Sequence, residues 1–213
     1  MDFGIVAAGI IIAYLLGSLP SAVWWGQAYY GIDVRDYGSC NAGATNTFRV
    51  LGRKAGIMVM GLDIFKGLTA VTLATVWVLL EFIPEKDLVL FKIIFGIAAV
   101  LGHIFPIYVN FKGGKGVATL LGMVLGINPL AALICVAVFF IVLLVSKHVS
   151  LGSMLGTLTF PLLLLITNLT PKDPILIIFG FFFFFVVLVT HTKNIKRIIQ
   201  GTENKVYLGV RKK

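Results

Sequence analysis

The residues best suited to bind an anion lie in a short run of glycine and lysine, residues 111–117, between two apolar stretches. Glycine lets a backbone close around a ligand, and the lysines beside it supply positive charge. A helix is predicted to begin near Val117, so the free N–H groups of the run and the positive end of the helix dipole would face the same anion as Lys115. The candidate phosphate-binding residues are Lys112, Gly113, Gly114, Lys115 and Gly116.

The run has two other interpretations. It is not a Walker A loop, because Gly116 rather than Ser or Thr follows Lys115 and no glycine stands at the required distance. It could instead be a membrane-surface anchor, with both lysines contacting lipid headgroups. An anchor needs charge but no unusual backbone geometry, so three glycines around Lys115 favour the phosphate site.

A second polar cluster occupies residues 38–49. Its small hydroxyl and amide side chains offer many hydrogen-bonding groups in little volume, and the fork of Arg49 suits a phosphate or carboxylate. The alternative is an ordinary polar loop whose side chains satisfy its own backbone. The candidate binding residues here are Ser39, Asn41, Thr45, Asn46 and Arg49.

Two further clusters, residues 146–153 and 191–196, carry weaker signals. Ser150 and Ser153 could bind a substrate or simply cap the helix that follows. His191 and Asn194 are three residues apart, so they share a face if the last apolar helix continues through them.

Among the ionisable residues within apolar stretches, Asp63, Lys66 and His103 stand out. Asp63 and Lys66 are three apart on one predicted helix and are expected to pair, which reduces the free-energy cost of burying charge in a bilayer. A structural role for this pair is at least as plausible as a functional one. His103, between Gly102 and Pro106, is interpreted in the same way, as a structural hydrogen-bond donor.

The composition determines what must position these clusters. Of 213 residues, 59% are hydrophobic and 13% are charged, and a mean hydropathy of +1.01 is too high for one water-soluble core. We predict an all-α integral membrane protein, a single polytopic domain over residues 1–213. Asn128-Pro129 predicts a tight turn, and the two short stretches that it joins could instead be one re-entrant pair. The seven predicted spans are near residues 4–26, 55–80, 88–109, 114–127, 130–146, 151–168 and 174–191.

The distribution of Lys and Arg predicts the orientation. With seven crossings, fourteen of these residues fall on one side, including seven in the tail from Lys193 to Lys213, and only Lys86 and Lys172 on the other. The positive-inside rule then puts the N-terminus outside, the C-terminus in the cytoplasm and all four polar clusters on the cytoplasmic side. The net charge of +9 therefore favours lipid headgroups and anionic substrates over nucleic acid.

Several catalytic signatures are missing. None of the three histidines is followed by the aspartate of a His-x4-Asp pair, and no Gly-x-Ser-x-Gly elbow exists. No cluster of carboxylates is suited to hold a catalytic metal, so we expect neither a metal nor another cofactor. The clusters therefore predict a site that binds phosphates with basic and amide groups.

Taken together, these motifs resemble the bacterial acyl-phosphate:glycerol-3-phosphate acyltransferases, the PlsY family, over nearly the whole chain. The matching segments, in the order of the family, are residues 17–20, residues 38–46 with Arg49, residues 102–106 and 111–119, and residues 150–153. The resemblance implies transfer of a fatty acyl group from acyl phosphate to the 1-hydroxyl of glycerol 3-phosphate, giving lysophosphatidic acid and phosphate. It also implies the bacterial inner membrane, membrane lipid around the chain and no obligate protein partner.

The resemblance further implies the roles of individual residues. Arg49 and Lys115 would carry phosphate charge, and Gly113 and Gly114 would shape the phosphate pocket. Either a substrate phosphate oxygen or His191 would accept the hydroxyl proton. The catalytic residues carried over by position are Ser39, Arg49, Lys115, Ser153, His191 and Asn194.

Two other classes of protein would share some of these sequence features. A transporter of phosphorylated solutes would also gather basic groups and helix ends, but it would often show paired repeats, and no convincing internal repeat exists here. A CDP-alcohol phosphotransferase would carry a spaced set of aspartates in one helix, whereas Asp63 stands alone in its predicted span.

Overall fold

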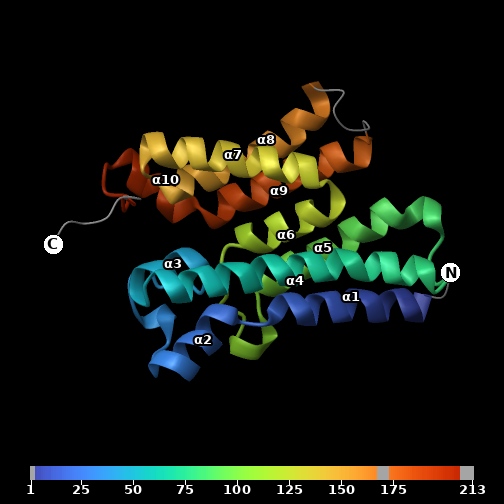
Figure 1. The fold of residues 1–213 in the computed structure, drawn as a ribbon, viewed down its shortest axis with the longest axis horizontal. Helices are drawn as coiled ribbons and strands as arrows, with labels where there is room; N and C mark the ends of the chain where they lie inside the picture. The colour runs from blue at the N-terminus through green and yellow to red at the C-terminus, as the bar shows by residue number, and fades with distance from the viewer. Residues whose placement is uncertain (1–2, 167–172, 207–213) are drawn as a thin grey trace. The chain divides into compact units, whose positions relative to one another are not determined.

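The computed structural model describes residues 3–166 and 173–206. These residues form helices and connecting loops without any strand, as the composition predicts. The chain divides into two compact units, residues 1–129 and residues 130–213, and each is described by itself (Figure 1).

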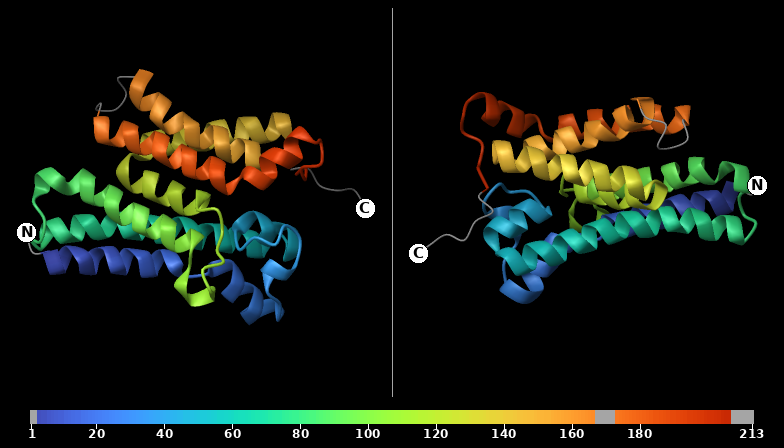
Figure 2. Two further views of the ribbon diagram at one scale, coloured as in Figure 1. Left: turned by 180° about the vertical axis from the view of Figure 1, so that it is seen from behind. Right: turned by 45° about the horizontal axis from the view of Figure 1, so that its top comes forward.

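The N-terminal unit is built around α4, the longest helix. α4 packs against α6, α5, α3 and α1, and α1 also packs along α5 (Figure 1, Figure 2). Its elements are α1 (Phe3–Ser18), α2 (Ser21–Tyr30), η1 (Val34–Asp36), α3 (Ala44–Val50), α4 (Arg53–Leu79), η2 (Glu85–Asp87), α5 (Leu88–Ile104), η3 (Ile107–Val109) and α6 (Val117–Ile127).

Small residues let the helices of this unit approach closely. A Cβ atom added to Gly67 would overlap the Thr119 carbonyl, and one added to Gly122 would overlap the Ile64 carbonyl, so α4 and α6 touch backbone to backbone. Such contacts are typical of helices that associate in membranes. They fix the start of α6, where the glycine–lysine run ends, against the middle of α4.

The first predicted span, residues 4–26, is divided into two helices. α1 and α2 are bent by 41° at a break between Ser18 and Ser21, because Pro20 has no N–H group and restricts Leu19 before it. The Leu19 carbonyl at the break accepts a hydrogen bond of 3.0 Å from Nζ of Lys66. The predicted ion pair is confirmed, with Lys66 Nζ 3.0 Å from an oxygen of Asp63 and both side chains buried.

The C-terminal unit contains the remaining helices. α8 packs against α9, and Gly152 and Gly156 bring α8 close to the backbone of α7. A bend of 65° at His191 separates α9 from α10. The last residues of the predicted sixth span, 167 and 168, lie outside the described residues. The helices are α7 (Pro129–Ser146), α8 (Val149–Ile166), α9 (Pro174–Thr190) and α10 (Thr192–Ile199).

The number of helices able to cross a membrane is smaller than the seven predicted spans. Among the described residues, four helices are long and apolar enough, and the count reaches six if each bent pair is one span. The predicted turn at Asn128 is confirmed, but α6 before it has only 11 residues. At 1.5 Å per residue, α6 is about 17 Å long, well short of a bilayer core of about 30 Å.

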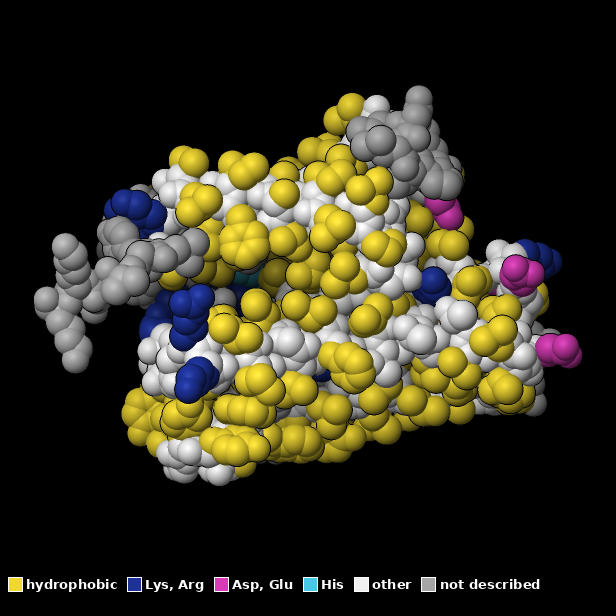
Figure 3. Space-filling model, in the orientation of Figure 1, with side chains coloured by type: hydrophobic (Ala, Val, Ile, Leu, Met, Phe, Trp, Pro, Cys, Tyr) yellow, Lys and Arg dark blue, Asp and Glu magenta, His cyan; other side chains and the backbone are white. Residues whose placement is uncertain are grey.

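Hydrophobic side chains cover most of the visible face of the N-terminal unit (Figure 3). Charged residues lie at opposite ends of α4, a helix of 27 residues and therefore roughly 40 Å long. Arg53 and Lys54 are exposed at its start, whereas Glu81 and Glu85 are exposed just after its end. The apolar surface with charges at both ends is the pattern of a protein embedded in lipid.

Candidate active site

Asn46 holds the turn that carries Ser39. Its buried side-chain oxygen accepts hydrogen bonds from the Ser39 backbone N–H at 2.8 Å and from the Ser39 hydroxyl at 3.1 Å. Its Nδ2 donates to the carbonyls of Val34 at 2.7 Å and Tyr37 at 3.1 Å. Both halves of the amide are thus used within the protein, which indicates that Asn46 shapes the site.

Arg49 lies in the last turn of α3, next to this turn. Its side chain is exposed, and a Cβ atom added to Gly38 would lie 3.4 Å from its Cδ. Gly38 has a φ of +64°, a left-handed conformation that glycine adopts without strain. The guanidinium of Arg49 therefore extends from a stem that lies beside Gly38, the residue before Ser39. Of the other candidates, Asn41 is half-buried in the turn and Thr45 is exposed on α3.

The glycine–lysine run is folded back against the end of α5. Gly113 N–H donates to the Ile104 carbonyl at 3.2 Å, and Gly114 N–H donates to the His103 carbonyl at 3.1 Å. The expectation that the N–H groups of the run are free for an anion is therefore wrong for these two glycines. They form a short bridge between two backbone segments and leave anion binding to the residues that follow.

Lys115 stands directly before the N-terminus of α6 and is half-buried. The predicted helix start at Val117 is confirmed, and Gly116 before it has a φ of +80°. The first intrahelical bond runs from Leu120 N–H to the Gly116 carbonyl, so the N–H groups of the first turn have no acceptor inside the helix. Lys115 and the positive helix end together suit a phosphate.

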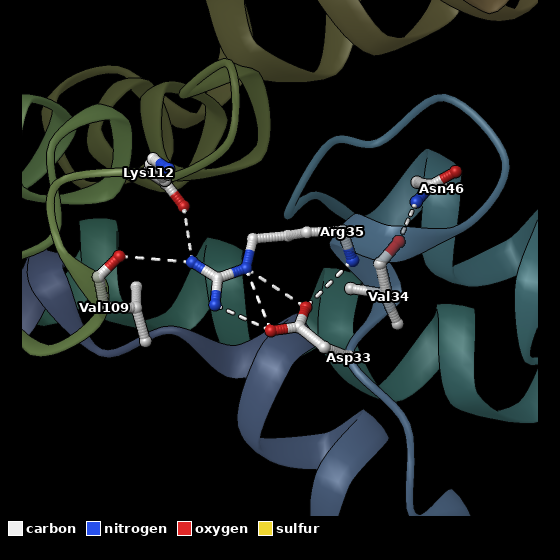
Figure 4. A network of polar contacts seen from close by, with 6 residues as sticks. All are labelled: Asp33, Val34, Arg35, Asn46, Val109 and Lys112. Atoms are coloured by element: carbon white, nitrogen blue, oxygen red, sulfur yellow. Dashed lines mark hydrogen bonds and ion pairs between the residues drawn. The ribbon is translucent and has the colours of Figure 1, made fainter.

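Arg35 joins the two polar clusters. Its Nη1 donates to the carbonyls of Val109 at 3.1 Å and Lys112 at 3.4 Å, while its Nε and Nη2 bind the Asp33 carboxylate (Figure 4). The Arg35 hydrogen bond lowers the pKa of Asp33. The segment just before the Ser39 turn and the glycine–lysine run, far apart in the sequence, therefore lie side by side. Arg35 is not among the predicted site residues, and only the Asp33-x-Arg35 spacing hints at its role.

In the C-terminal unit, Glu203 binds three side chains. Its Oε1 accepts hydrogen bonds from Asn194 at 2.6 Å and Ser150 at 2.8 Å, and its Oε2 lies 2.7 Å from Nε of Arg197. Burial raises the pKa of Glu203, but these hydrogen bonds outweigh burial and leave its pKa below the ordinary value. Glu203 is not among the predicted site residues, because a lone carboxylate in a basic tail carries no recognisable pattern.

The three predicted site residues of this unit, Ser153, His191 and Asn194, are buried. His191 lies at the bend between α9 and α10, so the last helix does not continue straight through it. Its Nδ1 is 2.8 Å from the Val187 carbonyl; because a carbonyl only accepts, Nδ1 carries a proton and Nε2 is the basic nitrogen of the neutral ring. Ser150, for which substrate binding and helix capping were the two alternatives, donates its hydroxyl to Glu203.

These contacts assemble the candidates into two groups, one in each unit. The N-terminal group contains Ser39, Arg49 and Lys115, and the C-terminal group contains Ser153, His191 and Asn194. That both groups form one site within one membrane domain stays a prediction. Among the described residues, no group of three or more His, Cys, Asp or Glu side chains could hold a metal ion.

Comparison with known proteins identifies the family. Residues 7–201 match the model of the glycerol-3-phosphate acyltransferases. The chain belongs to this family. A glycerol-3-phosphate acyltransferase of Macrococcus caseolyticus is 43% identical over 94% of this chain and 97% of its own length. The acyltransferase of Fusobacterium nucleatum is 42% identical over 92% of this chain and 95% of its own length.

Two solved structures of one acyltransferase resemble the whole chain. They are crystal structures of PlsY, an integral membrane glycerol 3-phosphate acyltransferase, in its glycerol 3-phosphate form and its lysophosphatidic acid form. The first has a TM-score of 0.80 and 33% identity over 95% of this chain, and the second has a TM-score of 0.78 and 32% identity. The protein is therefore an integral membrane enzyme with glycerol-3-phosphate acyltransferase activity, as the sequence motifs predict.

Proposed function

We propose that this acyltransferase uses an acyl phosphate as its donor and transfers the fatty acyl group to the 1-hydroxyl of glycerol 3-phosphate. The products are lysophosphatidic acid and inorganic phosphate. The observation that carries the proposal is the likeness to an enzyme crystallised in both its glycerol 3-phosphate and lysophosphatidic acid forms. With an acyl phosphate donor, both substrates carry a phosphate, which agrees with two cationic positions, Arg49 and Lys115.

The division of roles follows from charge and position. Lys115, at the positive end of α6, and Arg49, beside the Ser39 turn, neutralise phosphate charge. Ser39, Ser153 and Asn194 orient the substrates by hydrogen bonds, and Gly113, Gly114 and Gly116 give the loop its shape. Asn41, Thr45 and Lys112 complete the polar surface around them.

The chemical step needs little from the protein beyond alignment and charge. The glycerol hydroxyl oxygen attacks the acyl carbonyl carbon, a new C–O ester bond forms, and the bond between that carbon and the phosphate oxygen breaks. The phosphate leaves with the bonding electrons, and one of its oxygens takes the hydroxyl proton. In such a step, most of the rate enhancement comes from aligned substrates and from preorganised hydrogen-bond donors that stabilise the developing oxyanion. The competing proton acceptor is Nε2 of His191.

The orientation is part of the same proposal. The N-terminus lies outside the cytoplasmic membrane, and the polar clusters and the C-terminus lie in the cytoplasm, in a bacterial inner membrane. The exposed cations at the start of α4 and the exposed carboxylates beyond its end support this orientation. Seven crossings would require α6 and a neighbouring segment to cross the bilayer together. If α6 and α7 instead form a re-entrant pair, that pair does not cross, and the number of crossings is smaller.

A direct assay tests the donor. Purified protein in detergent is supplied with glycerol 3-phosphate and, in parallel, with palmitoyl phosphate or palmitoyl-CoA. We expect lysophosphatidic acid and phosphate to appear in equal amounts when palmitoyl phosphate is the donor, and no product when palmitoyl-CoA is the donor. Product formation from palmitoyl-CoA alone would overturn the donor assignment. The His191→Gln variant separates the proton acceptors: survival of the chemical step in single-turnover measurements supports the phosphate, and its loss with binding intact supports His191.

A further inference from the structure

A buried polar cluster lies behind the glycine–lysine run. It contains Asp63 and Lys66 from α4, His103 from α5 and Thr119 from α6, all buried. His103 Nδ1 lies 3.1 Å from the Thr119 hydroxyl and 3.6 Å from Oδ1 of Asp63, the oxygen that also pairs with Lys66. The imidazole is thus fixed from one edge by two helices.

The opposite edge of the same ring faces the run. A Cβ atom added to Gly114 would overlap Nε2 of His103 and would lie 3.1 Å from both Cδ2 and Cε1. The His103 carbonyl also accepts the Gly114 N–H at 3.1 Å. A small pocket is lined by residues of this cluster and by the run, among them Asp63, His103, Gly113 and Gly114. Nothing but hydrogen on Gly114 fits against the ring.

We propose that His103 is a positioning residue for the phosphate-binding loop. Its ring, held by Asp63 and Thr119, sets the position of the Gly114 backbone and thereby of Lys115, the next residue. This inference rests on the proposed function of Lys115 in binding phosphate. His103 itself does not contact the reacting groups, so its effect reaches the substrate through the loop.

The physical reason is that the loop has few other restraints on this side. Gly113 and Gly114 have no side chains to pack, so their location depends on two backbone hydrogen bonds and on the surface against which they lie. For Gly114, the His103 ring is that surface. A loop displaced by about 1 Å reduces the rate or affinity of an enzyme by up to about a hundredfold, because charge and substrate no longer align.

A purely structural role makes a different prediction. Removal of the ring would then lower the thermal stability of the protein and its active fraction without changing KM. A positioning role instead raises KM for glycerol 3-phosphate in the protein that remains folded. It also predicts that an added side chain at Gly114 becomes tolerable once the ring is removed.

The run offers a matched pair of glycines for this test. A Cβ atom at Gly114 meets the His103 ring, whereas a Cβ atom at Gly113 meets the His103 backbone carbonyl and Pro106. His103→Ala removes the first obstacle and leaves the second. Gly61→Ala on α4, where an added Cβ meets nothing within 4 Å, is the control for an alanine substitution as such.

The experiment measures KM for glycerol 3-phosphate, kcat and the thermal midpoint for purified G114A, G113A and H103A and for the doubles H103A/G114A and H103A/G113A. We expect H103A to raise KM about tenfold, and G114A to lose most activity and to regain several-fold when combined with H103A. G113A should regain no activity when it is combined with H103A. His103→Asn, which keeps a polar group toward Thr119 but lacks the atoms facing Gly114, replaces H103A if that variant fails to fold.

Two outcomes would overturn the proposal: equal behaviour of the two double variants, or an unchanged KM in both His103 variants. Failure of the underlying phosphate assignment looks different. In that case Lys115→Ala would leave KM for glycerol 3-phosphate unchanged. The thermal midpoint, lowered in G114A by the overlap with the His103 ring, would still rise in the double variant H103A/G114A.

Discussion

The Glu203 carboxylate accepts a hydrogen bond of 2.6 Å from the Asn194 side chain, and the same oxygen accepts one from Ser150 at the start of α8. The segment after α10 is therefore tied back to two helices. A second contact nearby, from Val206 N–H to the Lys147 carbonyl at 2.8 Å, strengthens the attachment. The predicted catalytic residue Asn194 is held in place by a carboxylate from the tail.

The contribution of Glu203 to the stability of the C-terminal unit depends on pH. Its pKa is lowered in the folded protein from an ordinary value of 4.5. The stabilisation is therefore fully present above pH 4.5 and is lost as pH falls through the lower folded pKa. Thermal midpoints in detergent between pH 3 and pH 7 should show this loss for the parent protein and a smaller one for Glu203→Gln. An equal slope in both proteins would contradict the assignment.

Asn46 should be needed for both folding and activity. Asn46→Ala removes the donors of two backbone carbonyls and the acceptor of two Ser39 groups, and each buried group left unpaired costs about 1–3 kcal/mol. We expect a clear fall in the thermal midpoint and a loss of kcat, because the Ser39 turn is released. Asn204→Ala, at an exposed position, is the matched control. An unchanged thermal midpoint of Asn46→Ala would show that the Ser39 turn does not depend on the hydrogen bonds of Asn46.

Arg35 should not be replaceable by lysine. A lysine keeps the charge, but one ammonium group cannot reproduce the fork that binds Asp33 and two carbonyls at once. Arg35→Lys is expected to raise KM for glycerol 3-phosphate about tenfold, because a binding loop displaced by about 1 Å can lose up to about a hundredfold in rate or affinity. Arg53→Lys, at an exposed position at the start of α4, provides the comparison. Equal kinetics of the two variants would exclude a role for Arg35 in joining the clusters.

Lys115 and Lys112 should differ although they flank the same glycines. Lys115→Ala is expected to abolish measurable acyl transfer while the thermal midpoint stays near that of the parent, because the side chain is half-buried before α6. Lys112→Ala should lose less activity, since it is the Lys112 carbonyl, not its side chain, that binds Arg35. A larger loss in Lys112→Ala would reverse the assignment of the phosphate ligand.

The elements that depend on local pattern are predictable from the sequence. Among the described residues, hydropathy locates the long apolar helices, Asn128-Pro129 marks the turn before α7, and the spacing of Asp63 and Lys66 predicts their ion pair. Hydropathy does not show the break at Pro20, because the apolar stretch continues across the proline that divides α1 from α2. Hydropathy reports burial in lipid and is insensitive to the direction of the chain.

The contacts that complete the site depend on distant residues. Arg35 binds a carbonyl 74 residues away, and Ser150 binds Glu203 across 53 residues. No periodicity or spacing in a single sequence encodes such pairings. The motifs of the site name the residues that face a ligand, whereas the supporting residues become visible only when the helices are packed.

The hydrogen bond from Lys66 to the Leu19 carbonyl also makes the first bend depend on a later part of the chain. The bend between α1 and α2 receives this donor from a residue 47 positions later in the chain. The bend gains this donor only when α4 packs beside it. An N-terminal fragment that ends before residue 66 would therefore lack the group that stabilises its own bend.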